Sequence, residues 1–134
     1  MKNTIKTIEN SKLEEILLNI DKDALTIIID GINVKTWMDY WNTMSKSFSF
    51  PALPAYMKPD YHSYYDLMTD LSWIKQEKIN IIFKNFSAFL KHDLKLKNDI
   101  INDFKDFLLP FWEKEVLETV INGKAKEFCV YTVN

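Results

Sequence analysis

The sequence predicts an α/β fold, in which a small three-stranded parallel sheet is packed with helices and preceded by a helical extension. The strands are three apolar, β-branched-rich runs at residues 24–29, 79–83 and 128–133. The segments between them carry apolar residues at three- and four-residue spacing, which is typical of helices that bury one face. Strands that alternate with helices usually form a parallel sheet through right-handed crossovers. We expect one domain over residues 1–134, with residues 1–20 as the extension.

The composition indicates a folded chain that stays in the cytoplasm. Of its 134 residues, 47% are hydrophobic and 14% are aromatic, which excludes a disordered protein. No apolar run approaches the roughly 18 residues that span a bilayer, and the charged N-terminus does not resemble an export signal. The single cysteine, Cys129, can form no internal disulfide, in agreement with a reducing compartment. We therefore expect a soluble, cytoplasmic monomer that does not bind a membrane.

The charged residues and the glycines exclude several functions. The net charge is -2, and all 17 basic residues are lysines. Arginine provides the planar, bidentate contacts favoured for phosphate and guanine, so its absence argues against direct nucleic-acid binding. The two glycines, Gly31 and Gly123, cannot make a phosphate loop or a dinucleotide fingerprint. We expect no cofactor.

The first 20 residues predict one helix. Apolar residues within 1–10 are too sparse to define an element, whereas Ser11 and Glu14 have the spacing of a capping box. A helix over about residues 12–20 follows, and its apolar stripe must be buried against the domain or against a partner. The stripe consists of Leu13, Ile16, Leu17 and Ile20.

The first predicted strand, at residues 24–29, ends in an Asp-Gly turn. A helix over about residues 36–48 follows, opened by Thr36 with Asp39 three residues on, as in a capping box. Large side chains at helical spacing are more often core than ligand site, so we expect this helix to pack on the sheet. Those side chains are Trp37, Met38, Tyr40, Trp41 and Met44.

A proline-rich loop and a short helix occupy residues 50–73. Pro51, Pro54 and Pro59 restrict the loop backbone, so no helix begins before Asp60, which is the natural N-cap. The segment holds one lysine against three aspartates, a local charge that favours a cationic partner. The helix has an apolar stripe of Tyr61, Tyr64, Tyr65, Met68, Leu71 and Ser72, and an opposite polar face of His62, Asp66, Thr69 and Asp70.

Two helical segments precede the last strand. Apolar spacing predicts a brief helix near residues 86–90 and a longer one over about residues 100–109. Pro110 lacks an N–H and clashes with the preceding turn, so we expect the helix to break or kink at Leu109. Apolar spacing continues beyond the proline until an Asn-Gly dipeptide, which fits a helix C-cap or a hairpin turn.

The loop and helix resemble the second-helix region of the barstar family. Leu53 and Pro54 are followed two residues on by a tyrosine, then a polar cap, then the run YYDLMTDLSW that begins at Tyr64. In that family a loop and helix block the active site of a secreted ribonuclease. The likeness covers residues 24–134, and its specific part is residues 50–73.

The resemblance implies a role for several residues. Tyr56 is then the loop aromatic at the interface, Asp66 the acid that sits among the nuclease's cationic catalytic groups, and Thr69 a polar contact one turn further on. Two positions depart from the best-known member, since His62 stands in place of a second interface aspartate and Lys58 in place of a loop glycine. With Tyr65 retaining the aromatic position before the key acid, the expected partner-binding residues are Tyr56, His62, Tyr65, Asp66, Thr69 and Asp70.

The same residues allow other interpretations. Without the resemblance, Asp66 is an ordinary solvated carboxylate. His62 and Asp66 also have the spacing of an acid–base pair or of two metal ligands, although no third group converges on them in the sequence. The tyrosines could stack RNA bases, but helical spacing assigns Tyr61 and Tyr64 to the core. We expect no catalytic residue and no metal site.

These observations favour a non-enzymatic inhibitor, an immunity protein or antitoxin, that blocks a basic ribonuclease or nuclease toxin domain through residues 54–70. A ribonuclease concentrates positive charge where phosphate binds, and a rigid carboxylate can occupy that position. The alternative is a barstar-fold interaction module whose partner is a non-nuclease toxin or another protein.

Overall fold

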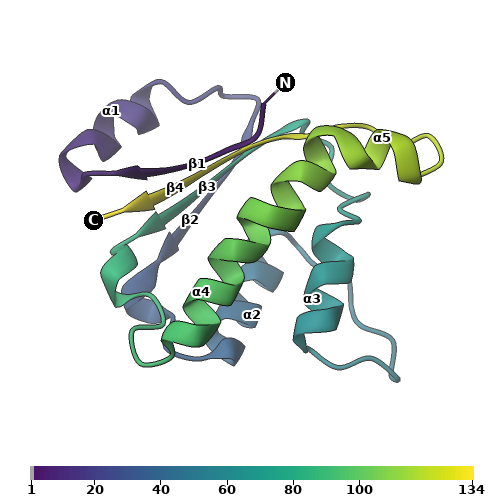
Figure 1. The fold of residues 1–134 in the computed structure, drawn as a ribbon, viewed down its shortest axis with the longest axis horizontal. Coiled ribbons are helices and arrows are strands. Elements are labelled where there is room, and N and C mark those ends of the chain that lie inside the picture. Colours follow the sequence, from purple (N-terminus) through teal and green to yellow (C-terminus); the bar gives the residue numbers. More distant parts are fainter. Residues whose placement is uncertain (1) are drawn as a thin grey trace.

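The chain forms a four-stranded parallel sheet in the computed structural model, which describes residues 2–134 (Figure 1). The strand order is β1-β4-β3-β2, and every neighbouring pair is parallel. The predicted α/β class is confirmed, and the three strands expected from the sequence are β2, β3 and β4. The strands are β1 (Thr4–Ile8), β2 (Leu25–Asp30), β3 (Lys78–Lys84) and β4 (Glu127–Val133).

Helices cover both faces of the sheet. In Figure 1, α2, α3 and α4 lie on one side of the sheet and α1 lies on the other. No helix within residues 2–134 is long and apolar enough to cross a bilayer. The α-helices are α1 (Leu13–Leu18), α2 (Trp37–Ser47), α3 (Tyr61–Met68), α4 (Leu94–Asp103) and α5 (Val116–Thr119); 3-10 turns occupy η1 (Asn10–Lys12), η2 (Gly31–Asn33) and η3 (Phe86–Ala88), and π turns occupy η4 (Phe104–Leu108) and η5 (Phe111–Glu115).

The prediction of three strands is wrong, because residues 4–8 form a fourth, β1, at the edge of the sheet. β1 pairs with β4 along its whole length. Only Ile5 and Ile8 pack partly against buried residues, while Lys6 and Thr7 are exposed. An edge strand is held largely by backbone hydrogen bonds to one neighbour, so its apolar pattern is too sparse to detect in the sequence.

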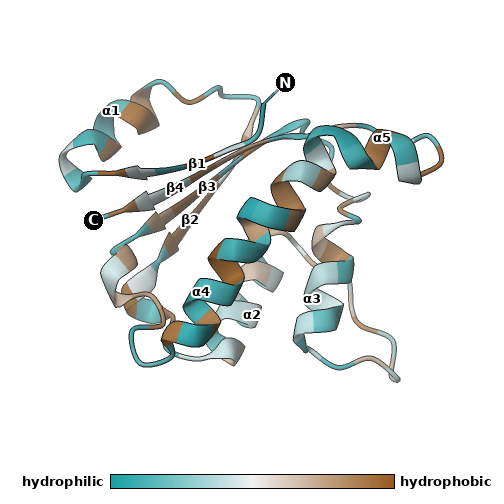
Figure 2. Cartoon of the chain, in the orientation of Figure 1, coloured by the Kyte–Doolittle hydropathy of each residue, from teal (hydrophilic) through white to brown (hydrophobic). Residues whose placement is uncertain are grey.

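The main core lies between the sheet and the helices α2 to α5. Figure 2 shows the central strands as strongly hydrophobic. Tyr40 of α2 and Tyr64 of α3 are both 0% exposed, and their hydroxyl groups share a hydrogen bond of 2.8 Å. The indole N–H of Trp112 donates to the Met68 carbonyl at 2.8 Å. These bonds satisfy polar atoms deep in the core and fix the position of α3.

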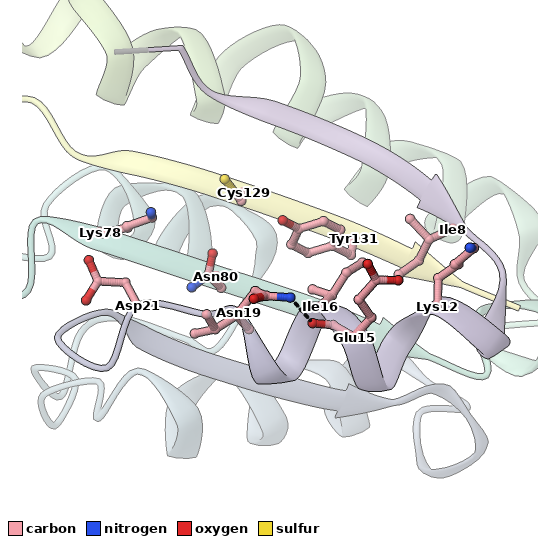
Figure 3. Close-up of a pocket in the computed structure, with 11 residues that line it drawn as sticks. Ile8, Lys12, Glu15, Ile16, Asn19, Asp21, Lys78, Asn80, Cys129 and Tyr131 are labelled. Carbon is pink, nitrogen blue, oxygen red and sulfur yellow. Dashed lines mark hydrogen bonds between the residues drawn. The ribbon is translucent and has the colours of Figure 1, made fainter.

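The N-terminal helix is shorter than expected and lacks its predicted cap. A 3-10 turn precedes α1, and neither Ser11 nor Glu14 provides a side-chain cap to either element. Figure 3 shows α1 on the sheet face that carries side chains of β3 and β4. Leu13 is buried there and Leu17 is exposed, while the other two residues of the predicted stripe are half-buried. The stripe is buried only in part because α1 ends at Leu18, after fewer than two turns.

The sequence predicts a break or a kink at Leu109; the chain stays helical through Pro110, so the helix does not break there. The π turns η4 and η5 flank the proline. A π turn shifts the backbone bonds to carbonyls five residues back, so the ring and the missing N–H are accommodated without ending the helix. Figure 1 shows the helix axis turning between α4 and α5.

Asp103, at the end of α4, places a carboxylate at the edge of the core. The residue is 8% exposed, and its Oδ2 atom has no hydrogen-bond partner. Burial raises the pKa of Asp103 to about 6, and the nearby Tyr61 hydroxyl opposes part of that change. The folded protein therefore holds this proton more tightly than the unfolded chain does.

Asp103→Asn should stabilise the protein above about pH 6. Between about pH 4 and pH 6 the folded state keeps a proton that the unfolded chain has lost, so the contribution of Asp103 to stability falls as the pH rises. We expect the free energy of unfolding of the variant to exceed that of the parent by about 1–2 kcal/mol at pH 7.5, and to match it near pH 4. Urea titrations at both pH values measure the difference. An equal gain from Asp106→Asn, at an exposed carboxylate nearby, would contradict an origin in burial.

Candidate functional site

Two tryptophans hold the ends of the proline-rich loop. The indole N–H of Trp73 donates to the Phe48 carbonyl at 2.7 Å, and that of Trp37 donates to the Pro59 carbonyl at 2.8 Å. The loop between these anchors presents Tyr56, which is 85% exposed. An aromatic side chain is thus displayed on a loop whose two ends are fixed.

Asp60 caps α3, as the sequence predicts. Its carboxylate accepts a hydrogen bond of 2.9 Å from the Ser63 N–H, and this bond lowers the pKa of Asp60. Behind the helix, Tyr64 and Met68 are fully buried. The cap at one end and the buried side chains behind give the outer face of α3 a rigid backbone.

The outer face of α3 carries His62 and Asp66 one turn apart. The distance from His62 Nε2 to Asp66 Oδ2 is 3.4 Å, and the two side chains are 83% and 51% exposed. A hollow of about 510 Å³, which we call the loop hollow, opens between the loop and these side chains. Its walls also include Tyr56, Lys58 and Asp60.

Thr69 and Asp70 lie at the other end of α3. The Thr69 hydroxyl donates to the Tyr65 carbonyl at 2.9 Å and so closes the last turn of the helix. Thr69 and Asp70 line a different hollow, of about 440 Å³, whose walls also include Val120 and Ile121 after α5. A partner that covers the whole of α3 would meet polar groups at one end, and at the other a mixed surface that includes the exposed side chains of Val120 and Ile121.

Tyr65 links α3 with the helical segment that follows α4. The side chain is half-buried, and burial together with the negative charges of Asp103, Glu115 and Asp66 raises the pKa of Tyr65. Sequence reasoning missed Asp103 and Glu115, because they are far from Tyr65 along the chain and only the fold brings them close. No local pattern marks either residue.

Lys58 and Asp60 also line the loop hollow. In the sequence, Lys58 stands out only as the replacement of a loop glycine and Asp60 only as the N-cap of α3. Lys58 lines the same hollow as the carboxylates of Asp60 and Asp66, so the surface is less acidic than α3 alone. The predicted residues fall into separate groups. Tyr56, His62 and Asp66 share the loop hollow, and Thr69 and Asp70 share the hollow at the end of the helix. Tyr65 lines neither hollow and packs against the core.

The arrangement is suited to contact with another protein. An exposed tyrosine and exposed carboxylates on a fixed loop and helix are the kinds of side chain that anchor protein interfaces and determine charge complementarity. Within residues 2–134, no three His, Cys, Asp or Glu side chains gather in a group that could hold a metal ion. The fold and the surface together define an α/β protein with an exposed, acidic loop-and-helix surface.

A family model described as Barstar (barnase inhibitor) matches residues 24–122. This match covers most of the chain and includes the whole loop-and-helix surface, so the chain belongs to the barstar family. By that description the family is one of inhibitors and not of enzymes. The elements β1, α1 and β4 lie outside the matched residues. Searches of curated proteins and of solved structures returned no match.

Trp37→Phe should loosen the loop while it keeps most of the ring packing. The substitution removes the N–H that donates to the Pro59 carbonyl. We expect the free energy of unfolding to fall by about 1 kcal/mol and the amides of residues 55–58 to exchange faster with solvent. Trp112→Phe is the control, because its lost bond is to Met68 at the far end of α3. Equal exchange in the loop for parent and Trp37→Phe would contradict the anchoring role.

Proposed function

We propose that this chain is an inhibitor, an immunity protein or antitoxin, that blocks the active site of a basic ribonuclease or nuclease toxin domain through residues 54–70. The observation that carries the proposal is the exposed carboxylate of Asp66, held on a rigid helix inside the region that matches the inhibitor family. Inhibition then requires no catalysis and no cofactor. It requires only a fixed negative group where the nuclease binds phosphate.

The chemistry of such a nuclease supports this assignment. Phosphate binding concentrates cationic side chains in a cleft, and a carboxylate that enters the cleft makes charge-assisted hydrogen bonds with them. Asp66 would occupy that position, with Asp60 and Asp70 adding to the negative field. Tyr56 and Tyr65 would pack at the rim, where aromatic side chains contribute strongly to interface affinity.

The remaining parts of the proposal concern where the protein acts and in what form. We propose that it acts as a cytoplasmic monomer, which would protect the cell from a nuclease made by itself or by neighbouring cells. A free thiol at Cys129, the single cysteine of the chain, is compatible with a reducing compartment. The bound molecule in this proposal is a protein and not a nucleic acid or a membrane.

A partner that is not a nuclease is the second candidate. The observation that favours it is the charge of the loop hollow, where His62 lies 3.4 Å from Asp66 and Lys58 lines the same hollow. Both basic groups weaken the attraction for a strongly cationic cleft. A partner with a mixed or weakly charged surface would fit this balance better.

Asp66→Ala should weaken binding to the nuclease by at least about 2 kcal/mol, or roughly thirtyfold in Kd, because Asp66 would be the central charged contact. Calorimetry with a purified nuclease, recovered from the host by affinity capture, measures the change. Glu118→Ala is the control, since Glu118 is exposed on α5 and lines neither hollow of α3. Parent-like affinity within twofold for Asp66→Ala would show that the assignment is wrong.

His62→Gln should make nuclease binding less dependent on pH. A positive charge on this imidazole would pair with Asp66 and repel a cationic partner, whereas glutamine carries no such charge. We expect the affinity of the parent to fall more than that of the variant when the pH is lowered from about 7.5 to about 5.5. Both proteins are compared against one nuclease preparation, because the titration of the partner then cancels. Superimposable affinity curves would place His62 outside the contact.

A further inference from the structure

A second hollow, of about 280 Å³, opens between α3 and α4. Tyr61 lines it from α3, whereas its sequence neighbours Asp60 and His62 line the loop hollow. The two hollows therefore lie on different sides of the first turn of α3. The other walls of this second hollow, which we call the α3–α4 hollow, are Asp99, Asn102, Asp103 and Phe107.

Asp103 has no cationic partner within residues 2–134, and only the Tyr61 hydroxyl on one side favours its charged form. Its Oδ2 atom is buried without a hydrogen bond, and the whole residue is only 8% exposed. The ion pairs formed by residues 2–134 do not include it, whereas the neighbouring Asp99 is paired with Lys95 at 2.9 Å. Buried polar atoms nearly always have partners, so an unpaired carboxylate in the wall of a hollow points to a group that arrives from outside.

The other walls have the chemistry that holds a cationic side chain. Tyr61 and Phe107 contribute aromatic rings, and Phe107 is 57% exposed. A guanidinium or ammonium group is attracted both to the face of such a ring and to a carboxylate. An anion or an apolar group in this place would leave Asp103 buried and uncompensated.

We propose that the α3–α4 hollow receives a lysine or arginine side chain from the protein that binds α3. The inference rests on the proposed function, because it takes the partner to be a cationic protein seated on the loop hollow. The two places are neighbours on α3, because Tyr61 of the α3–α4 hollow lies between Asp60 and His62 of the loop hollow in the chain. A partner that covers Asp66 thus lies next to the hollow that contains Asp103.

The site can be tested on the chain alone with acetyl-arginine amide as the probe. NMR titration should give saturable shifts of the Asp103 carboxyl and Tyr61 ring signals, with a dissociation constant on the order of millimolar. The probe should also lower the measured pKa of Asp103, because a bound cation stabilises the carboxylate. Acetyl-citrulline amide has nearly the same shape without the charge and should bind much more weakly. Equal shifts with both probes, or shifts that do not saturate, would contradict the proposal that the α3–α4 hollow binds a cationic side chain.

Variants locate the binding within the hollow. Asp103→Asn should weaken binding of acetyl-arginine amide about tenfold, since a charged hydrogen bond is lost. Phe107→Leu removes an exposed ring without disturbing the core and should weaken binding by a smaller factor. Asp106→Asn is the matched control, because Asp106 belongs to η4, the π turn that contains Phe107, but does not line the hollow. Parent-like binding by Asp103→Asn, or equal weakening by Asp106→Asn, would contradict the assignment.

The same variants separate this inference from the proposed function. With the purified nuclease, Asp103→Asn should raise the Kd about tenfold, mainly through faster dissociation. Unchanged nuclease affinity for Asp103→Asn, together with the expected loss for Asp66→Ala, would overturn only the use of the α3–α4 hollow by the partner. Unchanged affinity for Asp66→Ala would overturn the proposed function itself.

Discussion

The hydrogen bond between the hydroxyl groups of Tyr40 and Tyr64 supports the whole outer face of α3. Both tyrosines are completely buried, and their oxygen atoms lie 2.8 Å apart. A second bond, from Trp112 to the Met68 carbonyl, holds the last turn of the same helix. Either tyrosine without the other would leave a polar oxygen in an apolar core, so the two side chains specify one position for α3. The direction of His62 and Asp66 follows from that position.

Local signals made the inner part of the fold predictable. The capping box of Thr36 and Asp39 and the cap at Asp60 depend on residues three apart, and both are present in the structure. The three predicted strands are short runs rich in apolar and β-branched residues, a composition and length typical of strands. The loop-and-helix surface could be located for the same reason, because its prolines, cap and stripe are all neighbours along the chain.

Elements that depend on distant residues could not be predicted in this way. The Asn3 side chain holds the start of β1 by donating to the carbonyls of Leu109 and Lys126, and nothing near Asn3 in the sequence shows these partners. The helix through Pro110 likewise depends on π turns, whose hydrogen bonds are set by packing and not by composition. The position of Glu115 near Tyr65 follows from that continuous helix.

The carboxylates around α3 differ in their effect on the stability of the unbound protein. The Asp66 side chain is half-exposed, and the Asp60 carboxylate accepts a hydrogen bond from the backbone N–H of Ser63, so neither charge opposes folding. Asp103 is buried without a full set of partners, and its raised pKa means that its charge destabilises the folded state at neutral pH. A cation that enters the hollow from a partner would offset this penalty, and by linkage it would bind the ionised carboxylate more tightly than the protonated one to the extent that it lowers the pKa of Asp103. Asp103 would then destabilise the free chain and contribute to affinity in the complex. Such a trade-off is expected where a binding surface is optimised at the expense of stability.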